Sequence, residues 1–142
     1  MKGNGKGEGE RGQGETSATP YDMLGGEVKL RALVDRFYDL MDLEPDYAVI
    51  RKLHPTDLAH SRDKLFMFLS GWLGGPALYA ERYGNPMLRA RHLPFAIGVP
   101  ERDRWMQCMI RAMQETGVED RLRATLARAF FGTADWMRNR AE

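Results

Sequence analysis

Three histidines are the side chains of this sequence best suited to holding a metal: His54, His60 and His92. No two of them stand four residues apart, a spacing that would bring both to one helix face. The chain has one cysteine, Cys108, so a CxxC pair is absent. Structural zinc sites use several His or Cys ligands at recurring spacings. We therefore do not expect a zinc site.

His92 stands in the segment LRARHLPFAIG, residues 88–98. Pro94 cannot continue a helix, so we expect His92 at the end of a short turn. A haem needs only one protein ligand, a neutral imidazole whose other ring nitrogen is held by a carbonyl or a carboxylate. Arg89 and Arg91 could pair with haem propionates, because a guanidinium matches a carboxylate. Taken alone, however, such a histidine is more often a packed core residue, and such arginines are more often solvated.

Large apolar side chains are numerous for a chain of 142 residues. One face of the helix expected over residues 57–73 carries Leu58, Ser61, Leu65, Phe68 and Trp72, in which Ser61 is the small member. A close helix crossing at Ser61 explains this pattern, and so does a non-protein group that fills the space. Walls of this kind bind flat cofactors. Other bulky side chains are Phe66, Met67, Met87, Phe95, Trp105, Met106, Met109, Met113, Phe130 and Phe131.

Other catalytic chemistries lack their residues. Ser61, Ser70 and Cys108 have no histidine at a catalytic spacing, and Cys108 lies on an apolar stripe, where a thiol is inert. The glycine pairs at 25–26 and 74–75 belong to no phosphate-binding motif. Nucleophilic catalysis and nucleotide binding are therefore not expected.

Helical periodicity runs through the chain after residue 20, for example from Leu30 to Met41. No alternating strand pattern is present, so we expect an all-α domain of five or six helices, with Asp57 as one N-cap. The breaks are Pro45, the Gly74-Gly75-Pro76 run and a turn-rich stretch marked by Pro86 and Pro94. The expected helices cover about 30–41, 47–53, 57–73, 102–116 and 119–139.

Composition bounds the class of protein. Residues 1–20 carry six glycines and no large apolar side chain after Met1, so we expect a disordered glycine-rich extension before one domain over 21–142. The net charge of +1 gives no case for a nucleic-acid partner. No apolar run approaches the ~20 residues of a membrane span, and no signal core is evident. With a single cysteine, a cytoplasmic location is the default expectation.

Three segments taken in order resemble the truncated haemoglobins, a branch of the globin superfamily, and more narrowly their group II. They are FLSGWLGGP at 68–76, LYAERYGNPMLRARHLPF at 78–95 and ERDRWMQCM at 101–109. A single His-x-Pro-Phe motif would be weak evidence for a family. The three segments in this order are specific evidence, with His92 and Trp105 thirteen residues apart. The resemblance runs from about Tyr21 to Met137. It implies the truncated-globin two-over-two helical sandwich, closed around haem b (iron protoporphyrin IX), and the two glycine pairs match the glycines of that fold.

The resemblance also implies roles for single residues. His92 matches the proximal iron ligand, Tyr38 and Trp105 match the distal hydrogen-bond donors, and His54 falls where a third polar contact is expected. Ser61 takes the position at which many globins place a distal histidine. Asn85 departs from the commoner histidine in its turn. The implied haem contacts are Ser61, Lys64, Leu65, Phe68, Tyr79, Arg91, His92, Phe95, Trp105 and Met109.

The function implied by the resemblance is binding of dioxygen and other diatomic ligands at a five-coordinate iron. Two donors to a partly negative ligand would slow its escape by roughly 100-fold, which argues against bulk transport. Whether the chain is also an enzyme stays open: the alternatives are a nitric oxide dioxygenase or peroxidase-like enzyme served by a reductase, and a haem-based gas sensor. A homodimer is also open. A weaker alternative is a haemless protein that binds anions through Arg82, Arg89, Arg91, Arg102 and Arg104.

Overall fold

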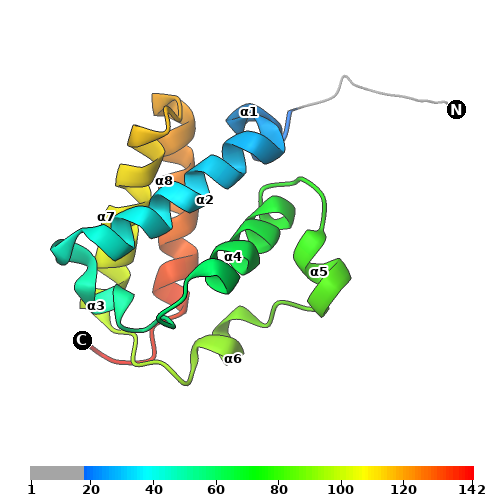
Figure 1. Ribbon diagram of the computed structural model, residues 1–142. Coiled ribbons are helices and arrows are strands. Elements are labelled where there is room, and N and C mark those ends of the chain that lie inside the picture. Colours follow the sequence, from blue (N-terminus) through cyan, green and yellow to red (C-terminus); the bar gives the residue numbers. More distant parts are fainter. Residues whose placement is uncertain (1–17) are drawn as a thin grey trace, which may run out of the picture.

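The computed structural model describes residues 18–142, and within them it contains helices and no strand (Figure 1). Of the extension expected over residues 1–20, residues 1–17 lie outside the described part of the chain, whereas Thr19 is the N-cap of the first helix and Pro20 is its first residue. The elements are α1 (Pro20–Leu24), α2 (Gly26–Leu43), the 3-10 helix η1 (Pro45–Tyr47), α3 (Ala48–Arg51), α4 (Ala59–Trp72), α5 (Leu78–Tyr83), α6 (Leu88–His92), α7 (Val99–Glu115) and α8 (Asp120–Trp136).

The four long helices form two crossed pairs. α2 packs against α4, and α7 packs against α8. The first pair lies across the second, with α2 in contact with α7 (Figure 1). This is the two-over-two sandwich, so the expected all-α fold is confirmed. The main core lies where α2 meets α7, and it includes the fully buried Leu33, Phe37, Cys108 and Met109.

Glycines allow the sharp turns between these helices. Gly25 lies between α1 and α2 with a φ of 119°, Gly26 begins α2 with a φ of 81°, and Gly74 follows α4 with a φ of 95°. A side chain is strained at such positive φ values, whereas glycine is not. A Cβ at Gly75 would also meet the ring of Tyr21. The two glycine pairs thus let α1 fold back onto the end of α4, where the Tyr21 backbone N–H donates to the Leu73 carbonyl at 2.9 Å.

The number and the ends of the helices differ from the expectation. Residues 18–142 hold eight α-helices rather than five or six, because the short helices α1, α5 and α6 carry too few turns to show a periodicity. The helix expected from Arg102 begins at Val99, since Pro100 lies in its first turn, where a missing N–H costs nothing. α4 has Leu58 as its N-cap, but the Asp57 carboxylate still accepts from the Ala59 N–H at 2.9 Å.

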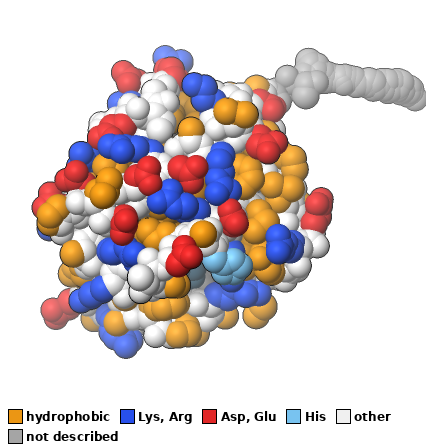
Figure 2. Space-filling model, viewed as in Figure 1, with side chains coloured by type: hydrophobic (Ala, Val, Ile, Leu, Met, Phe, Trp, Pro, Cys, Tyr) orange, Lys and Arg blue, Asp and Glu red, His pale blue; other side chains and the backbone are white. Residues whose placement is uncertain are grey.

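The surface carries acidic and basic side chains interspersed, as Figure 2 shows for the face that includes α2 and α4. Arg62 of α4 donates to the carboxylate of Asp39 at 2.7 Å and to that of Asp35 at 3.3 Å. The α2 carboxylates therefore bridge two helices, although exposed ion pairs of this kind contribute little to stability. No described helix combines the length and the apolar character needed to cross a bilayer.

Candidate functional site

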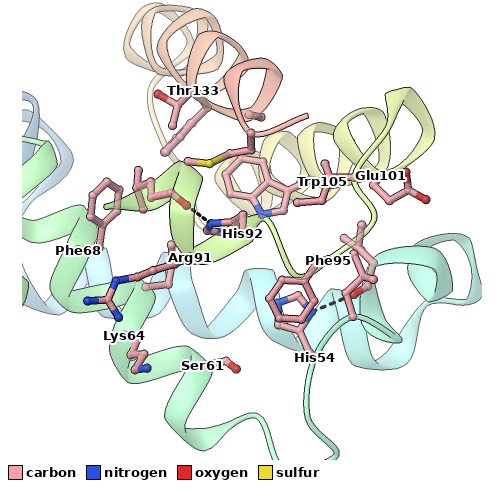
Figure 3. A pocket seen from close by; sticks show the side chains of 18 of the residues that line it. His54, Ser61, Lys64, Phe68, Arg91, His92, Phe95, Glu101, Trp105 and Thr133 are labelled. Carbon is pink, nitrogen blue, oxygen red and sulfur yellow. Dashed lines mark hydrogen bonds between the residues drawn. The ribbon is translucent and has the colours of Figure 1, made fainter. Parts of the chain in front are cut away.

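A cavity of about 390 Å³ opens between α4, α6, α7 and α8, with α2 and the α3–α4 segment closing one end (Figure 3). Most of its lining is apolar. The structure brings together around it nearly all the residues singled out from the sequence: Tyr38, His54, Ser61, Lys64, Leu65, Phe68, Tyr79, Arg91, His92, Phe95 and Trp105. His60 is exposed and does not line the cavity.

Met109 is the exception among the expected cofactor contacts. It does not line the cavity and is fully buried in the main core. Met109 stands one helical turn beyond Trp105 on α7, where that helix already packs against α2. The geometry therefore gives no support to a cofactor contact from Met109.

His92 ends α6, and its ring is held by its own helix. The Nδ1 atom lies 2.6 Å from the carbonyl oxygen of Leu88, as the dashed line in Figure 3 marks. A carbonyl only accepts, so Nδ1 donates in this contact, and Nε2 is the ring nitrogen that makes no hydrogen bond to the described chain. A carbonyl contact of this kind orients a histidine that ligates a metal, so the geometry of His92 is compatible with that role.

Two hydrogen-bond donors line the cavity without a protein partner. Tyr38 of α2 is only 5% exposed, and Trp105 of α7 is half-buried. Neither the Tyr38 hydroxyl nor the Trp105 indole N–H is hydrogen-bonded to another residue of the described chain. Burial raises the pKa of Tyr38 well above its ordinary value, so the phenol stays protonated. A donor held away from water without a partner is costly, so Tyr38 with Trp105 beside it in one cavity points to a bound polar group.

Phe37 fixes the positions of these donors. Its ring makes an edge contact with Tyr38 at 5.1 Å between centroids and another with Trp105 at 5.2 Å. Since Phe37 is fully buried, it cannot shift without disturbing the core. The orientations of the Tyr38 and Trp105 rings are therefore fixed by packing, independently of any ligand.

His54 lies beside Tyr38, with ring centroids 5.7 Å apart. Its Nδ1 donates to the Ile50 carbonyl at 2.8 Å. Burial lowers the pKa of His54, and the positive charge of Arg51 lowers it further, so the ring is neutral at pH 7. Its Nε2 then offers a lone pair and no hydrogen. The expected third polar contact is therefore an acceptor in this geometry, rather than a donor to a negative ligand.

Aromatic rings form a continuous wall of the cavity. Trp105 contacts Phe130 at 5.7 Å, Phe130 stacks on Trp72 at 5.1 Å, and Trp72 stacks on Phe68 at 6.3 Å between centroids. Phe68 in turn meets the edge of Tyr79 at 6.4 Å. This wall presents flat apolar surface, which excludes water and suits a planar cofactor.

Cationic side chains mark one edge of the cavity, from α4 and α6 (Figure 3). Lys64 and Arg91 have no carboxylate partner among the described residues. The Arg91 guanidinium donates to the Pro86 carbonyl at 2.8 Å and lies 5.9 Å from the Tyr79 ring centroid. Two cations without a counter-charge at the edge of an apolar cavity fit the propionates of a haem.

Arg89 does not join this edge, contrary to the sequence expectation. Its guanidinium donates to the carbonyls of Trp136 and Arg138 at 2.9 and 3.0 Å. Residues two apart on a helix point to different sides, so α6 can direct only one of Arg89 and Arg91 toward the cavity. Asn85 serves its own turn, where its side chain accepts from the Met87 N–H at 3.1 Å.

Sequence reasoning did not assign several residues of this cavity. Ile97 comes from the loop after α6, while Thr133 and Met137 come from α8 and its end. Thr133 and Met137 share a helix face with Phe130, at spacings of three and seven residues. That shared helix face was the sequence signal from which Thr133 and Met137 could have been predicted to line the cavity. No such signal exists for Ile97.

Comparisons with known proteins agree with this geometry. The family model described as bacterial-like globin matches residues 19–139. A relative described as group 2 truncated hemoglobin YjbI of Bacillus subtilis (strain 168) is 40% identical over 129 residues, which covers 91% of this chain and 95% of the relative.

Two solved structures are similar along nearly their whole length. A group II 2-on-2 hemoglobin from the plant pathogen Agrobacterium tumefaciens is 42% identical with a TM-score of 0.85, covering 89% of this chain and 98% of that one. A structure described as truncated oxygen-avid haemoglobin from Bacillus subtilis is 41% identical with a TM-score of 0.79, covering 86% of this chain and 100% of that one.

Proposed function

Because this chain belongs to the bacterial-like globins, and among them to the group II truncated haemoglobins, we propose that it binds haem b through His92 and retains dioxygen tightly. A haem cofactor and small diatomic ligands follow from the family. The observation that carries the finer proposal is the pairing, in one apolar cavity, of an imidazole whose Nε2 has no protein partner with two donors, the buried Tyr38 and the half-buried Trp105, that also have none.

The donor set supports a non-covalently held haem. Attachment through thioethers uses a C-x-x-C-H motif, and this chain has one cysteine. Cys108 is fully buried and its thiol donates to the Phe37 carbonyl at 3.3 Å. The residues that would hold the group are His92 at the iron, Lys64 and Arg91 at the propionates, and the aromatic wall along the ring. This arrangement supports a b-type haem.

When bound, the haem supplies a ferrous iron that takes a diatomic ligand and leaves it partly negative. The chain's own contribution is to hold that ligand. The Trp105 indole can only donate, and the raised pKa of Tyr38 keeps its hydroxyl available as a second donor. Each charge-assisted hydrogen bond contributes about 1.5–3 kcal/mol. The surrounding aromatic wall keeps water from competing for these donors.

The partner of His92 favours ligand retention over peroxidase-like chemistry. Leu88 offers a neutral carbonyl, whereas a carboxylate in that place would make the imidazole a stronger electron donor. The similar protein from Bacillus subtilis is described as oxygen-avid, which supports the same function here. A protein that releases dioxygen slowly must keep its iron ferrous, so a reductase is an expected partner.

The release of dioxygen from the haem-loaded protein tests this function. Replacing Trp105→Phe removes one donor and keeps an aromatic ring, so we expect release to quicken roughly 10- to 100-fold in stopped-flow measurements. Trp136→Phe is the matched control, because Trp136 is 60% exposed and lies outside the cavity lining. Equal rates in all three proteins would contradict the role given to Trp105.

A further inference from the structure

The helix that carries His92 has little to hold it in place. α6 contains five residues, and none of them is buried. It packs extensively against no other described helix. A short helix of this kind is not stable by itself, since helices draw most of their stability from packing of an apolar face. The position of His92 must therefore be fixed by other contacts.

Those contacts come from the C-terminal strap, which we define as residues 137–142. The strap follows α8 and runs back along the segment after α6 (Figure 1). Asn139 joins this segment through both its backbone and its side chain. Its N–H donates to the Ile97 carbonyl at 2.9 Å, and its Oδ1 accepts from the Ile97 N–H at 3.0 Å.

The amide nitrogen of Asn139 reaches closer to the ligand histidine. Its Nδ2 donates to the Phe95 carbonyl at 2.8 Å and to the His92 carbonyl at 3.4 Å. One side chain thus joins three residues of a loop that begins at His92. Together with the two Ile97 bonds, these hydrogen bonds fix the path of the loop.

α6 itself is also tied to the end of α8 and to the strap. Arg89 of α6 donates to the carbonyls of Trp136 and Arg138 at 2.9 and 3.0 Å. Asp135 anchors the start of the strap, because its carboxylate accepts from Arg138 and from Arg102, each at 2.8 Å. The strap therefore holds α6 from two sides and is itself fixed to α7 and α8.

The end of the strap lies so close to Gly98 that only glycine fits at that position. A Cβ at Gly98 would collide with the carbonyl oxygen of Glu142, although the φ of Gly98 is an ordinary negative one. Any larger residue would displace the strap from the loop. Gly98 and Asn139 thus belong to one contact between the C-terminus and the loop that follows His92.

We propose that Asn139 is a positioning residue for His92, acting through the main chain of residues 92–97 to set where the imidazole stands. The inference rests on the proposed function in one respect, that His92 is the haem ligand. Its geometric part, the attachment of the loop by the strap, stands on the hydrogen bonds alone.

The test uses the full-length haem-loaded protein and the variant Asn139→Ala. We expect amide hydrogen exchange at Ile97 to quicken by roughly tenfold or more, with exchange in α2 and α7 unchanged. We also expect the iron–histidine stretching band in the resonance Raman spectrum of the ferrous protein to shift or broaden. A chain ending at Arg138 should show both effects, because it lacks Asn139. Arg140→Ala is the matched control, since the Arg140 side chain bonds only to the Asn139 carbonyl within the strap.

Two results would overturn the proposal. The first is a wild-type iron–histidine band in Asn139→Ala, which would mean that the strap holds the loop without positioning His92. The second is faster exchange throughout α2 and α7, which would mean a general loss of stability. Failure of the proposed function is seen separately, as an iron–histidine band that persists in His92→Ala. The exchange measurement on Asn139→Ala still reports on the strap in that case.

Discussion

Tyr38 and Trp105 stand on helices of 18 and 17 residues, whereas His92 stands on a helix of five. The donors' helices meet in the main core, where Phe37 contacts both rings. The helix of His92 buries none of its residues and is held by hydrogen bonds from Asn139 to the His92 carbonyl and from Arg89 to the Trp136 carbonyl. The same cavity thus has one side fixed by close packing and another side held by a few hydrogen bonds.

This difference indicates that the two sides of the cavity contribute in different ways to ligand and haem binding. Directional donors gain most from a rigid support, because a hydrogen bond weakens steeply when its angle is wrong. A metal-ligating residue is ordered in part by the metal itself. The free energy of metal binding, which is present only in the loaded protein, also stabilises the position of the ligand. We therefore expect the two sides to respond differently to mutation and to loss of haem.

The largest expected effect is on the side of α6. His92→Ala removes the only protein ligand that we assign to the iron, so haem transfer to an acceptor globin should quicken by more than ~100-fold. His60→Ala is the control, because His60 is exposed and lies outside the cavity lining. A rate close to that of the wild type in His92→Ala would assign the iron to another residue.

The second prediction compares both sides in one protein. Binding of haem should slow amide exchange over residues 88–98 by roughly 30-fold, and in α2 by less than about threefold, because α2 is already packed in the core. Exchange followed by mass spectrometry with and without haem checks this. If haem protected residues 88–98 and α2 from exchange equally, the proposed difference in rigidity between the two sides of the cavity would be wrong.

The third prediction concerns the packed side. Tyr38→Phe removes a donor and keeps the ring, so dioxygen release should quicken by roughly tenfold while haem affinity stays the same. Stopped-flow release and haem transfer measure the two quantities. A loss of haem affinity in this variant would show that Tyr38 supports the cavity and does not only serve the ligand.

The smallest effect belongs to Cys108, which joins α7 to α2 through the Phe37 carbonyl. Burial raises the pKa of its thiol from 9.0 to about 12. The folded state therefore keeps the proton where the unfolded state loses it, and this contribution to stability is full below pH 9 and is lost as the pH rises toward 12. The unfolding temperature should fall more in the wild type than in Cys108→Ala across that range. Parallel curves for the two proteins would contradict this.

The sequence was sufficient to predict the positions of residues that lie on a long helix or in a specific motif. Periodicity predicted the helices that became α2, α4, α7 and α8, and the spacing of His92 and Trp105 supported the family. Tyr38 and Trp105 both line the cavity, and their role toward a ligand stays a prediction. The helix predictions succeeded because an amphipathic helix of four or more turns leaves a readable pattern.

The features that differ from the sequence expectation depend on contacts that no local pattern carries. α5 and α6 are too short to show a period, and Arg89 was expected at the propionates although α6 turns it toward Trp136. Met109 follows Trp105 by one turn, yet the crossing of α7 with α2 buries it away from the cavity. Asn139 lies beyond α8, and its role depends on a loop that precedes it by more than forty residues.

Titration of the purified chain with haemin tests the central claim most directly. The account predicts a Soret band that saturates at one haem per chain and, after reduction, the spectrum of a five-coordinate ferrous haem bound by histidine. Uptake without a fixed stoichiometry, or a reduced spectrum that is the same in His92→Ala, would contradict it.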